Sequence, residues 1–198
     1  MDLLYLSEHQ TRLKPQEGTA CVLSWAQFAE WLSKPKYGTD KTQAGGYSPG
    51  LYKDNIRHLD KLEHVCALVF DIDVNGDTPR VAEKMAAYSC IVHETYSSTG
   101  ATPRCRLLVE TRSPVDAWTY GVSHRKLLKA LKELHVHPDE NATDASRLSY
   151  CPVRPLGSKY QFAFVRGAPV DALALAADTP RRCVVIQAVA GRGSSTPT

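Results

Sequence analysis

The segment that most constrains this chain runs from His64 to Val74 and reads HVCALVFDIDV. Apolar residues that favour a strand lead directly into two aspartates, Asp71 and Asp73, which are separated by Ile72. Successive side chains of a strand point to opposite faces, so this spacing predicts both carboxylates on one face and Ile72 in the core. Two carboxylates at a strand end are oxygen ligands suited to hard divalent cations. The alternative is an exposed strand end whose acids are simply solvated.

The composition is that of an ordinary globular protein. The chain has 198 residues, enough for one sizeable core or a main domain with a small appendage, and its net charge of +3 neither requires nor excludes a nucleic-acid partner. No apolar run approaches the roughly 18 residues of a membrane span, and no secretory signal begins the chain. The six cysteines are scattered without a CxxC pair, which predicts free thiols and no structural zinc. We therefore expect a cytoplasmic protein with no membrane partner.

Apolar periodicity and capping signals predict an α+β fold, with helices mostly on one face of a sheet. Ser24, Thr78 and Ser113 are the expected N-caps of three helices. The helices are expected over residues 25–33, 79–87 and 114–134, and the strands over residues 3–6, 19–23, 65–73, 90–93, 104–110, 160–165 and 184–190.

The same pattern suggests three regions along the chain. We expect an N-terminal α/β subregion with a basic loop over residues 1–62 and a core domain over residues 63–190. Residues 191–198, GRGSSTPT, have the composition of a disordered linker, as expected where a longer protein was cut or where a tail begins.

Two groups of basic residues are candidates for phosphate binding. Arg104 and Arg106 alternate along a predicted strand and so share a face, next to the hydroxyl-rich loop TYSSTGATP; charged forks of this kind suit a triphosphate. The alternative is an exposed edge strand whose charged side chains prevent pairing with another chain. Lys41, Arg57 and Lys61 lie in or near a glycine-rich loop, which is either a solvated surface loop or a basic lip beside the carboxylates. No GxxxxGK loop supports an ATPase.

Three blocks in order resemble the catalytic domain of archaeo-eukaryotic primases, specifically the bifunctional primase-polymerases of phages, plasmids and mobile elements. LVFDID at 68–73 is similar to the family's metal motif. YSSTGATPRCRLLV at 96–109 is similar to its nucleotide-binding segment, and DENATDASRLSYCP at 139–152 to the segment that carries a third acid. The resemblance covers residues 20–165. It departs at Ser98, where many relatives have a nucleotide-contacting histidine. Either nucleotide affinity differs from that of the relatives, or another residue, such as His93, takes over the contact.

The resemblance implies an RRM-like antiparallel or mixed sheet with flanking helices, and a template-directed nucleotidyltransferase that makes or extends primers. Two Mg²⁺ or Mn²⁺ ions would be held by Asp71, Asp73 and a third acid, which is Asp144 or Asp139, with Asp144 favoured by its link to Ser146 and Arg147. An incoming NTP or dNTP would be bound by Ser97, Ser98, Arg104, Arg106 and Arg147. A single-stranded DNA template would be contacted by Lys41, Arg57 and Lys61. A helicase domain or protein is the expected partner in replication.

Two other functions fit parts of the sequence. A rolling-circle nuclease would use His135-Val136-His137 as its metal motif and Tyr150 or Tyr160 as its nucleophile, although the pair follows a predicted helix and precedes Pro138. A non-catalytic RRM-like module would bind nucleic acid by stacking bases on exposed aromatics, of which the predicted strands carry few.

Overall fold

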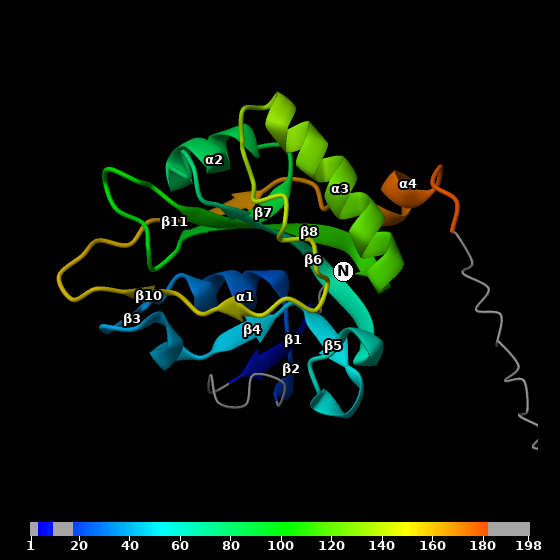
Figure 1. Cartoon of the computed structure of the whole chain (residues 1–198), viewed down its shortest axis with the longest axis horizontal. Coiled ribbons are helices and arrows are strands. Elements are labelled where there is room, and N and C mark those ends of the chain that lie inside the picture. Colours follow the sequence, from blue (N-terminus) through cyan, green and yellow to red (C-terminus); the bar gives the residue numbers. More distant parts are fainter. Residues whose placement is uncertain (1–3, 10–17, 182–198) are drawn as a thin grey trace, which may run out of the picture.

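The central feature of the computed structural model is a five-stranded sheet (Figure 1). The structure describes residues 4–9 and 18–181. Each neighbouring pair of strands in this sheet is antiparallel, which confirms the predicted α+β fold with an antiparallel sheet. The strand order is β11 (Phe162–Arg166), β7 (Ser89–Glu94), β8 (Cys105–Val115), β6 (Leu62–Ile72) and β5 (Gly50–Tyr52).

Helices cover one face of this sheet, and a smaller β-layer lies against the other (Figure 1). Helices α2 (Thr78–Lys84), α3 (Ala117–Glu133) and α4 (Ala172–Ala176) lie on the first face. On the second face, α1 (Trp25–Leu32) accompanies a four-stranded sheet and a two-stranded sheet. The four-stranded sheet contains β2 (Thr19–Leu23), β1 (Leu4–His9), β4 (Gly46–Ser48) and β9 (Ser149–Tyr150), and the two-stranded sheet contains β10 (Val153–Arg154) and β3 (Lys36–Tyr37). The described residues also contain three 3-10 helices: η1 (Lys41–Ala44), η2 (Lys53–Asn55) and η3 (Leu59–Lys61).

Strand β6 divides its side chains between two hydrophobic cores. Phe70 and Ile72 are almost fully buried in the core beneath α2 and α3. Ala67 and Val69 belong to the core that α1 forms on the opposite face. The alternation of a strand then brings Asp71 to the α1 side, as the sequence predicts.

The N-caps of α1 and α2 can be compared with those predicted from the sequence. Helix α1 has the predicted capping box, in which the Gln27 amide donates to Ser24 Oγ at 3.2 Å and the Ser24 amide donates to Gln27 Oε1 at 2.8 Å. The prediction for α2 was wrong by one residue: Thr78 is the first helical residue, and Asp77 is the N-cap. Its carboxylate accepts from the Arg80 amide at 3.0 Å, a bond that only the residue before Thr78 is placed to make.

The predicted start of the long helix at Ser113 was wrong. Strand β8 continues to Val115, which pairs with Val65 of β6, so strand pairing extends past the expected cap. The helix α3 begins after Asp116, whose carboxylate accepts from the Thr119 amide at 2.8 Å.

Each β-layer contains strands from before and from after residue 62. The early strand β5 joins the central sheet through β6, and the late strand β9 joins the small sheet through β4. The division into residues 1–62 and 63–190 therefore stays a prediction, and the expected strand at 184–190 and the tail at 191–198 lie outside the described residues. Of the cysteines in the described ranges, Cys66, Cys90, Cys105 and Cys151 are buried and Cys21 is partly buried. Over those same ranges, no helix combines the length and apolar character that crossing a bilayer requires.

Candidate active site

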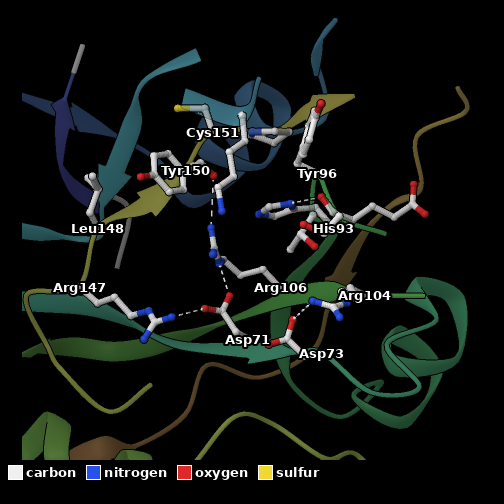
Figure 2. Close-up of a pocket in the computed structure, with 15 residues that line it drawn as sticks. Asp71, Asp73, His93, Tyr96, Arg104, Arg106, Arg147, Leu148, Tyr150 and Cys151 are labelled. Carbon is white, nitrogen blue, oxygen red and sulfur yellow. Dashed lines mark hydrogen bonds and ion pairs between the residues drawn. The ribbon is translucent and has the colours of Figure 1, made fainter. Parts of the chain in front are cut away.

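A pocket of about 270 Å³ lies between the central sheet and the small β-layer (Figure 2). Its sheet-side wall carries Asp71 of β6 and Asp73, which follows that strand, together with arginines, whereas Tyr96, Tyr150 and Cys151 lie across from them. Four cationic side chains and three carboxylates line it, which leaves a small positive excess. The charged lining residues are Lys41, Asp71, Asp73, Glu94, Arg104, Arg106 and Arg147.

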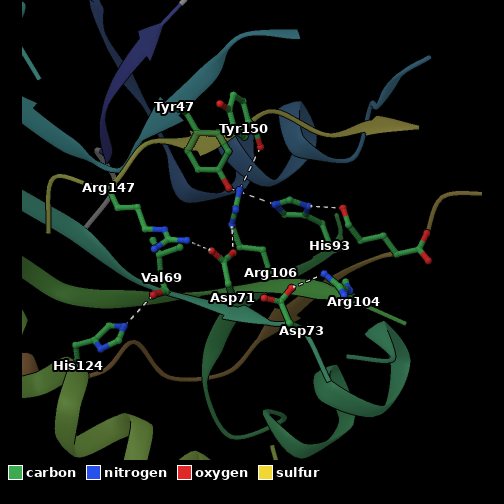
Figure 3. Close-up of polar contacts among 11 residues, drawn as sticks. Tyr47, Val69, Asp71, Asp73, His93, Arg104, Arg106, His124, Arg147 and Tyr150 are labelled. Atoms are coloured by element: carbon green, nitrogen blue, oxygen red, sulfur yellow. Dashed lines mark hydrogen bonds and ion pairs between the residues drawn. The ribbon is translucent and has the colours of Figure 1, made fainter. Parts of the chain in front are cut away.

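Asp71 is the most tightly held acid of the pocket (Figure 3). Arg106 Nε donates to its Oδ1 at 2.6 Å, and Arg147 Nη2 donates to its Oδ2 at 3.1 Å. The Asp71 side chain is 11% exposed and that of Arg106 10%, whereas that of Arg147 is 43% exposed. Burial alone would raise the pKa of Asp71, but the two guanidiniums outweigh burial and hold that pKa below its usual value. Asp71 is therefore ionised at neutral pH.

Asp73 is held much more loosely. Its Oδ1 lies 3.5 Å from Arg104 Nη1, and both side chains are substantially exposed, at 53% for Asp73 and 40% for Arg104. Arg104 Nε is buried and has no hydrogen-bond partner in the described part of the chain. Because the Arg104 side chain is 40% exposed and its carboxylate partner is held loosely, its guanidinium is accessible to an anionic ligand.

His93 joins the two layers beneath the pocket (Figure 3). Its Nδ1 lies 2.9 Å from the Glu94 carbonyl oxygen and its Nε2 lies 3.2 Å from the Tyr47 hydroxyl. A carbonyl only accepts, so Nδ1 carries the proton in the neutral ring and Nε2 accepts from Tyr47. Burial, with the nearby charge of Arg106, lowers the pKa of His93 to about 4. The ring is neutral at physiological pH.

Arg106 also connects the two walls of the pocket. Besides Asp71, its guanidinium donates through Nη1 to the Tyr150 carbonyl oxygen on β9 at 3.2 Å. Its burial is therefore compensated by an anion on one wall and a backbone dipole on the other.

The two serines of the predicted nucleotide-binding loop have different places. Ser97 is exposed and lines the pocket. Ser98 is buried: its Oγ donates to Glu94 Oε1 at 3.1 Å and accepts from the Arg104 amide at 3.1 Å. Arg154 Nη1 donates to the Ser98 carbonyl oxygen at 3.3 Å. Ser98 thus fixes the loop and the start of β8, and it is not among the residues that line the pocket.

The two candidates for a third carboxylate lie in the loop between α3 and β9. The Asp139 amide donates to the Asp71 carbonyl oxygen at 2.8 Å, which places Asp139 against the end of β6. The Asp144 carboxylate is exposed and accepts from the amide and the hydroxyl of Ser146, at 2.8 and 2.9 Å. Neither acid lines the pocket. Over the ranges that the structure describes, no three His, Cys, Asp or Glu side chains form a ready-made metal centre.

The three basic residues predicted to contact a template, Lys41, Arg57 and Lys61, lie apart from one another. Lys41 lines the pocket. Arg57 Nη1 donates to the Ser146 carbonyl oxygen at 2.6 Å and so supports the turn that carries Arg147. Lys61 forms an exposed ion pair with Asp54 at 2.8 Å, outside the pocket. Template binding by these residues stays a prediction.

The paired histidines of the nuclease alternative do not lie on a strand. Helix α3 ends with Leu134 as its C-cap, and His135 follows with a φ of 55°, in a turn. Residues 135–137 contain no strand, so the His-hydrophobic-His motif lacks the sheet that would aim both rings at one ion.

Sequence reasoning missed much of the wall opposite the aspartates. Tyr96 was not among the predicted site residues, and Tyr150 was considered only as a nuclease nucleophile. Glu94 of the central sheet and the buried Tyr47, which bonds to His93, were also missed. The signal available was indirect: polar residues at the ends of short apolar runs, without a spacing that points to one ligand.

The chain belongs to the VapE N-terminal domain family, whose model matches residues 12–178. This match confirms the expected membership in a primase-like group of phages and mobile elements. Among solved structures, the AEP domain of the primase-polymerase of cyanophage S-2L is similar to this chain, with a TM-score of 0.48 and 13% identity. The alignment covers 90% of this chain and 89% of that one. A search of curated proteins found no match.

Proposed function

We propose that the pocket binds a nucleoside triphosphate and that this domain is a template-directed nucleotidyltransferase, which makes or extends primers on single-stranded DNA. The observation that carries the proposal is the convergence of two strand-end carboxylates with three arginines on one pocket wall. Phosphoryl and nucleotidyl transfer depend on positioning and on charge stabilisation, which is what such a wall supplies.

The arginines have different roles in this proposal. Arg106 is buried and committed to Asp71 and to the Tyr150 carbonyl, so it orients the carboxylate and supports the pocket. Arg104, whose side chain is partly exposed and only weakly paired with Asp73, is the first phosphate ligand. Arg147 is more exposed and bonds one oxygen of Asp71, so its guanidinium is able to turn from that carboxylate to a bound phosphate. Ser97, at the pocket edge, contributes a hydroxyl donor.

The carboxylates of Asp71 and Asp73 are donors of the kind that Mg²⁺ and Mn²⁺ prefer, and both line the pocket. When bound, two such ions would lower the pKa of the attacking 3′-hydroxyl and stabilise the leaving pyrophosphate. In the structure the positive charges of Arg106 and Arg147 pair with the Asp71 carboxylate, which keeps it deprotonated and fixes its position.

For the third acid we favour Asp139 over Asp144, because the amide of Asp139 is bonded to the Asp71 backbone. The carboxylates do not separate the two, since each accepts within its own turn, from Asn141 at Asp139 and from Ser146 at Asp144. Replacing each acid by asparagine in turn distinguishes them. Substitution of the acid that binds the metal should lower Mn²⁺ affinity, and substitution of the other acid should leave it unchanged.

Asp73→Asn is the cleanest test of catalysis, because Asp73 is half exposed and makes only a long contact. We expect this variant to keep its fold, seen by circular dichroism, and to lose at least about 100-fold in nucleotidyl transfer, as when a stabilising group is removed from an active site. The assay uses a single-stranded template, labelled nucleotides and Mn²⁺, with products sized on a gel. Asp60→Asn, a change at an exposed acid outside the pocket, is the matched control. Wild-type synthesis by Asp73→Asn would refute the assignment.

The same assay separates the alternatives. A binding module retains oligonucleotide affinity and forms no phosphodiester bond, whereas a nuclease shortens the template. Supplying NTPs and dNTPs separately identifies the preferred sugar, and dinucleotide formation distinguishes priming from extension. A replication role in a mobile element, with a helicase as partner, belongs to the same proposal.

A further inference from the structure

Lys41 reaches the pocket from the small β-layer, across from the arginine wall. It begins the 3-10 helix η1, which packs against β9 and β10 of that layer. The arginines, by contrast, belong to the central sheet or to the turn before β9. Lys41 is therefore a pocket cation from a different part of the fold.

The ammonium group of Lys41 has an unusual partner. It lies 5.3 Å from the centre of the Tyr150 ring, a cation–π contact. In the described part of the chain no carboxylate pairs with it. The ring holds the charge in place without neutralising it.

Lys41 and three arginines line one pocket with three carboxylates, which leaves a small positive excess. Asp71 and Asp73 already pair with Arg106, Arg147 and Arg104, so they are committed to cations other than Lys41. A ligand with several negative charges would balance this excess, and a lysine ammonium suits phosphate because it is a compact charge with three donors.

We propose that Lys41 binds the phosphates of the incoming nucleotide from the wall opposite Arg104, and that Tyr150 holds it there. The triphosphate then bridges the central sheet and the small layer. This assignment replaces the template contact that the sequence predicted for Lys41, and it rests on the proposed nucleotide site.

The test compares Lys41→Ala with wild type and with Lys36→Ala. Lys36 is an exposed lysine of the same layer, on β3, and it does not line the pocket. Isothermal titration calorimetry without divalent ions measures the Kd of inorganic tripolyphosphate and of a nucleoside triphosphate. Fluorescence anisotropy measures the Kd of a labelled single-stranded oligonucleotide.

We expect Lys41→Ala to weaken both tripolyphosphate and nucleoside triphosphate by about tenfold, the size of one charge-assisted hydrogen bond. Equal losses for the two ligands show that Lys41 contacts phosphate rather than base or sugar. Lys36→Ala should leave both Kd values unchanged, and Lys41→Arg should recover part of the loss. Equal tripolyphosphate affinity in Lys41→Ala and Lys36→Ala, or a loss confined to the oligonucleotide, would overturn the proposal.

The role of Tyr150 is tested by a double-mutant cycle. Tyr150→Phe keeps the ring and should keep wild-type tripolyphosphate affinity. Tyr150→Leu removes the ring and should weaken binding by a few-fold in wild type, but not further in Lys41→Ala. An equal loss in both backgrounds contradicts coupling between the two residues.

Failure of this inference is distinguishable from failure of the proposed function. If Arg104→Ala lowers triphosphate affinity and Lys41→Ala does not, the nucleotide site stands and the role of Lys41 is wrong. If wild-type protein binds neither tripolyphosphate nor nucleoside triphosphate, the proposed function fails, and the role of Lys41 fails with it.

Discussion

Replacing Arg106 by alanine should destabilise the protein far more than the same change at Arg104. The two arginines are two positions apart and line the same pocket, but only Arg106 is buried. Alanine at 106 removes the bond to Asp71 and the bond to the Tyr150 carbonyl. Alanine at 104 removes one exposed contact of 3.5 Å.

The expected magnitudes follow from that difference in burial. Removing one member of a buried ion pair costs about 3–5 kcal/mol, because the other charge is left buried, whereas an exposed pair contributes about 0–1 kcal/mol. Arg147 still faces Asp71 in the Arg106→Ala variant, so we expect the lower end, about 3 kcal/mol. For a protein of this length that corresponds to a fall in Tm of about 6–12 °C.

The assay is equilibrium unfolding in urea at neutral pH, followed by far-ultraviolet circular dichroism. A second comparison uses Arg106→Met alone and together with Asp71→Asn. Because the double variant has no unpaired buried charge, it should recover at least half of the stability lost in Arg106→Met. Unfolding free energies of Arg106→Ala and Arg104→Ala that agree within about 0.5 kcal/mol would refute the reasoning.

Three further changes test other parts of the structure. The pKa of His93 in the folded protein, about 4, lies below the usual 6.5, so between these pH values the unfolded chain binds one more proton than the folded chain and stability decreases as the pH is lowered. His93→Gln should reduce this loss of stability by about 3 kcal/mol, measured by urea unfolding at pH 7 and at pH 4. Gly76→Ala should lower stability by about 1–3 kcal/mol in thermal melts, because a Cβ there would lie 2.5 Å from the Ile72 carbonyl oxygen, while Gly100→Ala, with open space around it, should be neutral. Ser98→Ala should cost about 1–2 kcal/mol of stability and leave the tripolyphosphate Kd unchanged. Ser97→Ala, at an exposed residue that lines the pocket, should leave stability unchanged and raise the tripolyphosphate Kd.

The wall that carries the aspartates could be predicted because its signals are local. Alternation at the end of β6 predicts that Asp71 and Asp73 lie together, and alternation at the start of β8 does the same for Arg104 and Arg106, and all four line the pocket. The antiparallel register then sets Asp71 directly opposite Arg106. Two short patterns, each readable from the sequence, thus account for most of that wall.

The opposite wall depends on contacts between distant segments. Pairing of β4 with β9 sets Gly46 opposite Tyr150, more than 100 positions later in the sequence, and this pairing brings η1 and Lys41 beside the Tyr150 ring. No local period encodes that register. The start of α3 was missed for the same reason, since pairing of β8 with β6 extends the strand past a good capping sequence.

The proposed nucleotide would join the same two layers that Arg106 joins. Arg106 binds Asp71 on one layer and the Tyr150 carbonyl on the other, and Lys41 lies over the ring of the same tyrosine. A triphosphate held between Lys41 and Arg104, as proposed, would therefore add a second connection between these layers. Because ligand and fold share these contacts, phosphate binding should also stabilise the fold, by an amount set by ligand concentration relative to Kd.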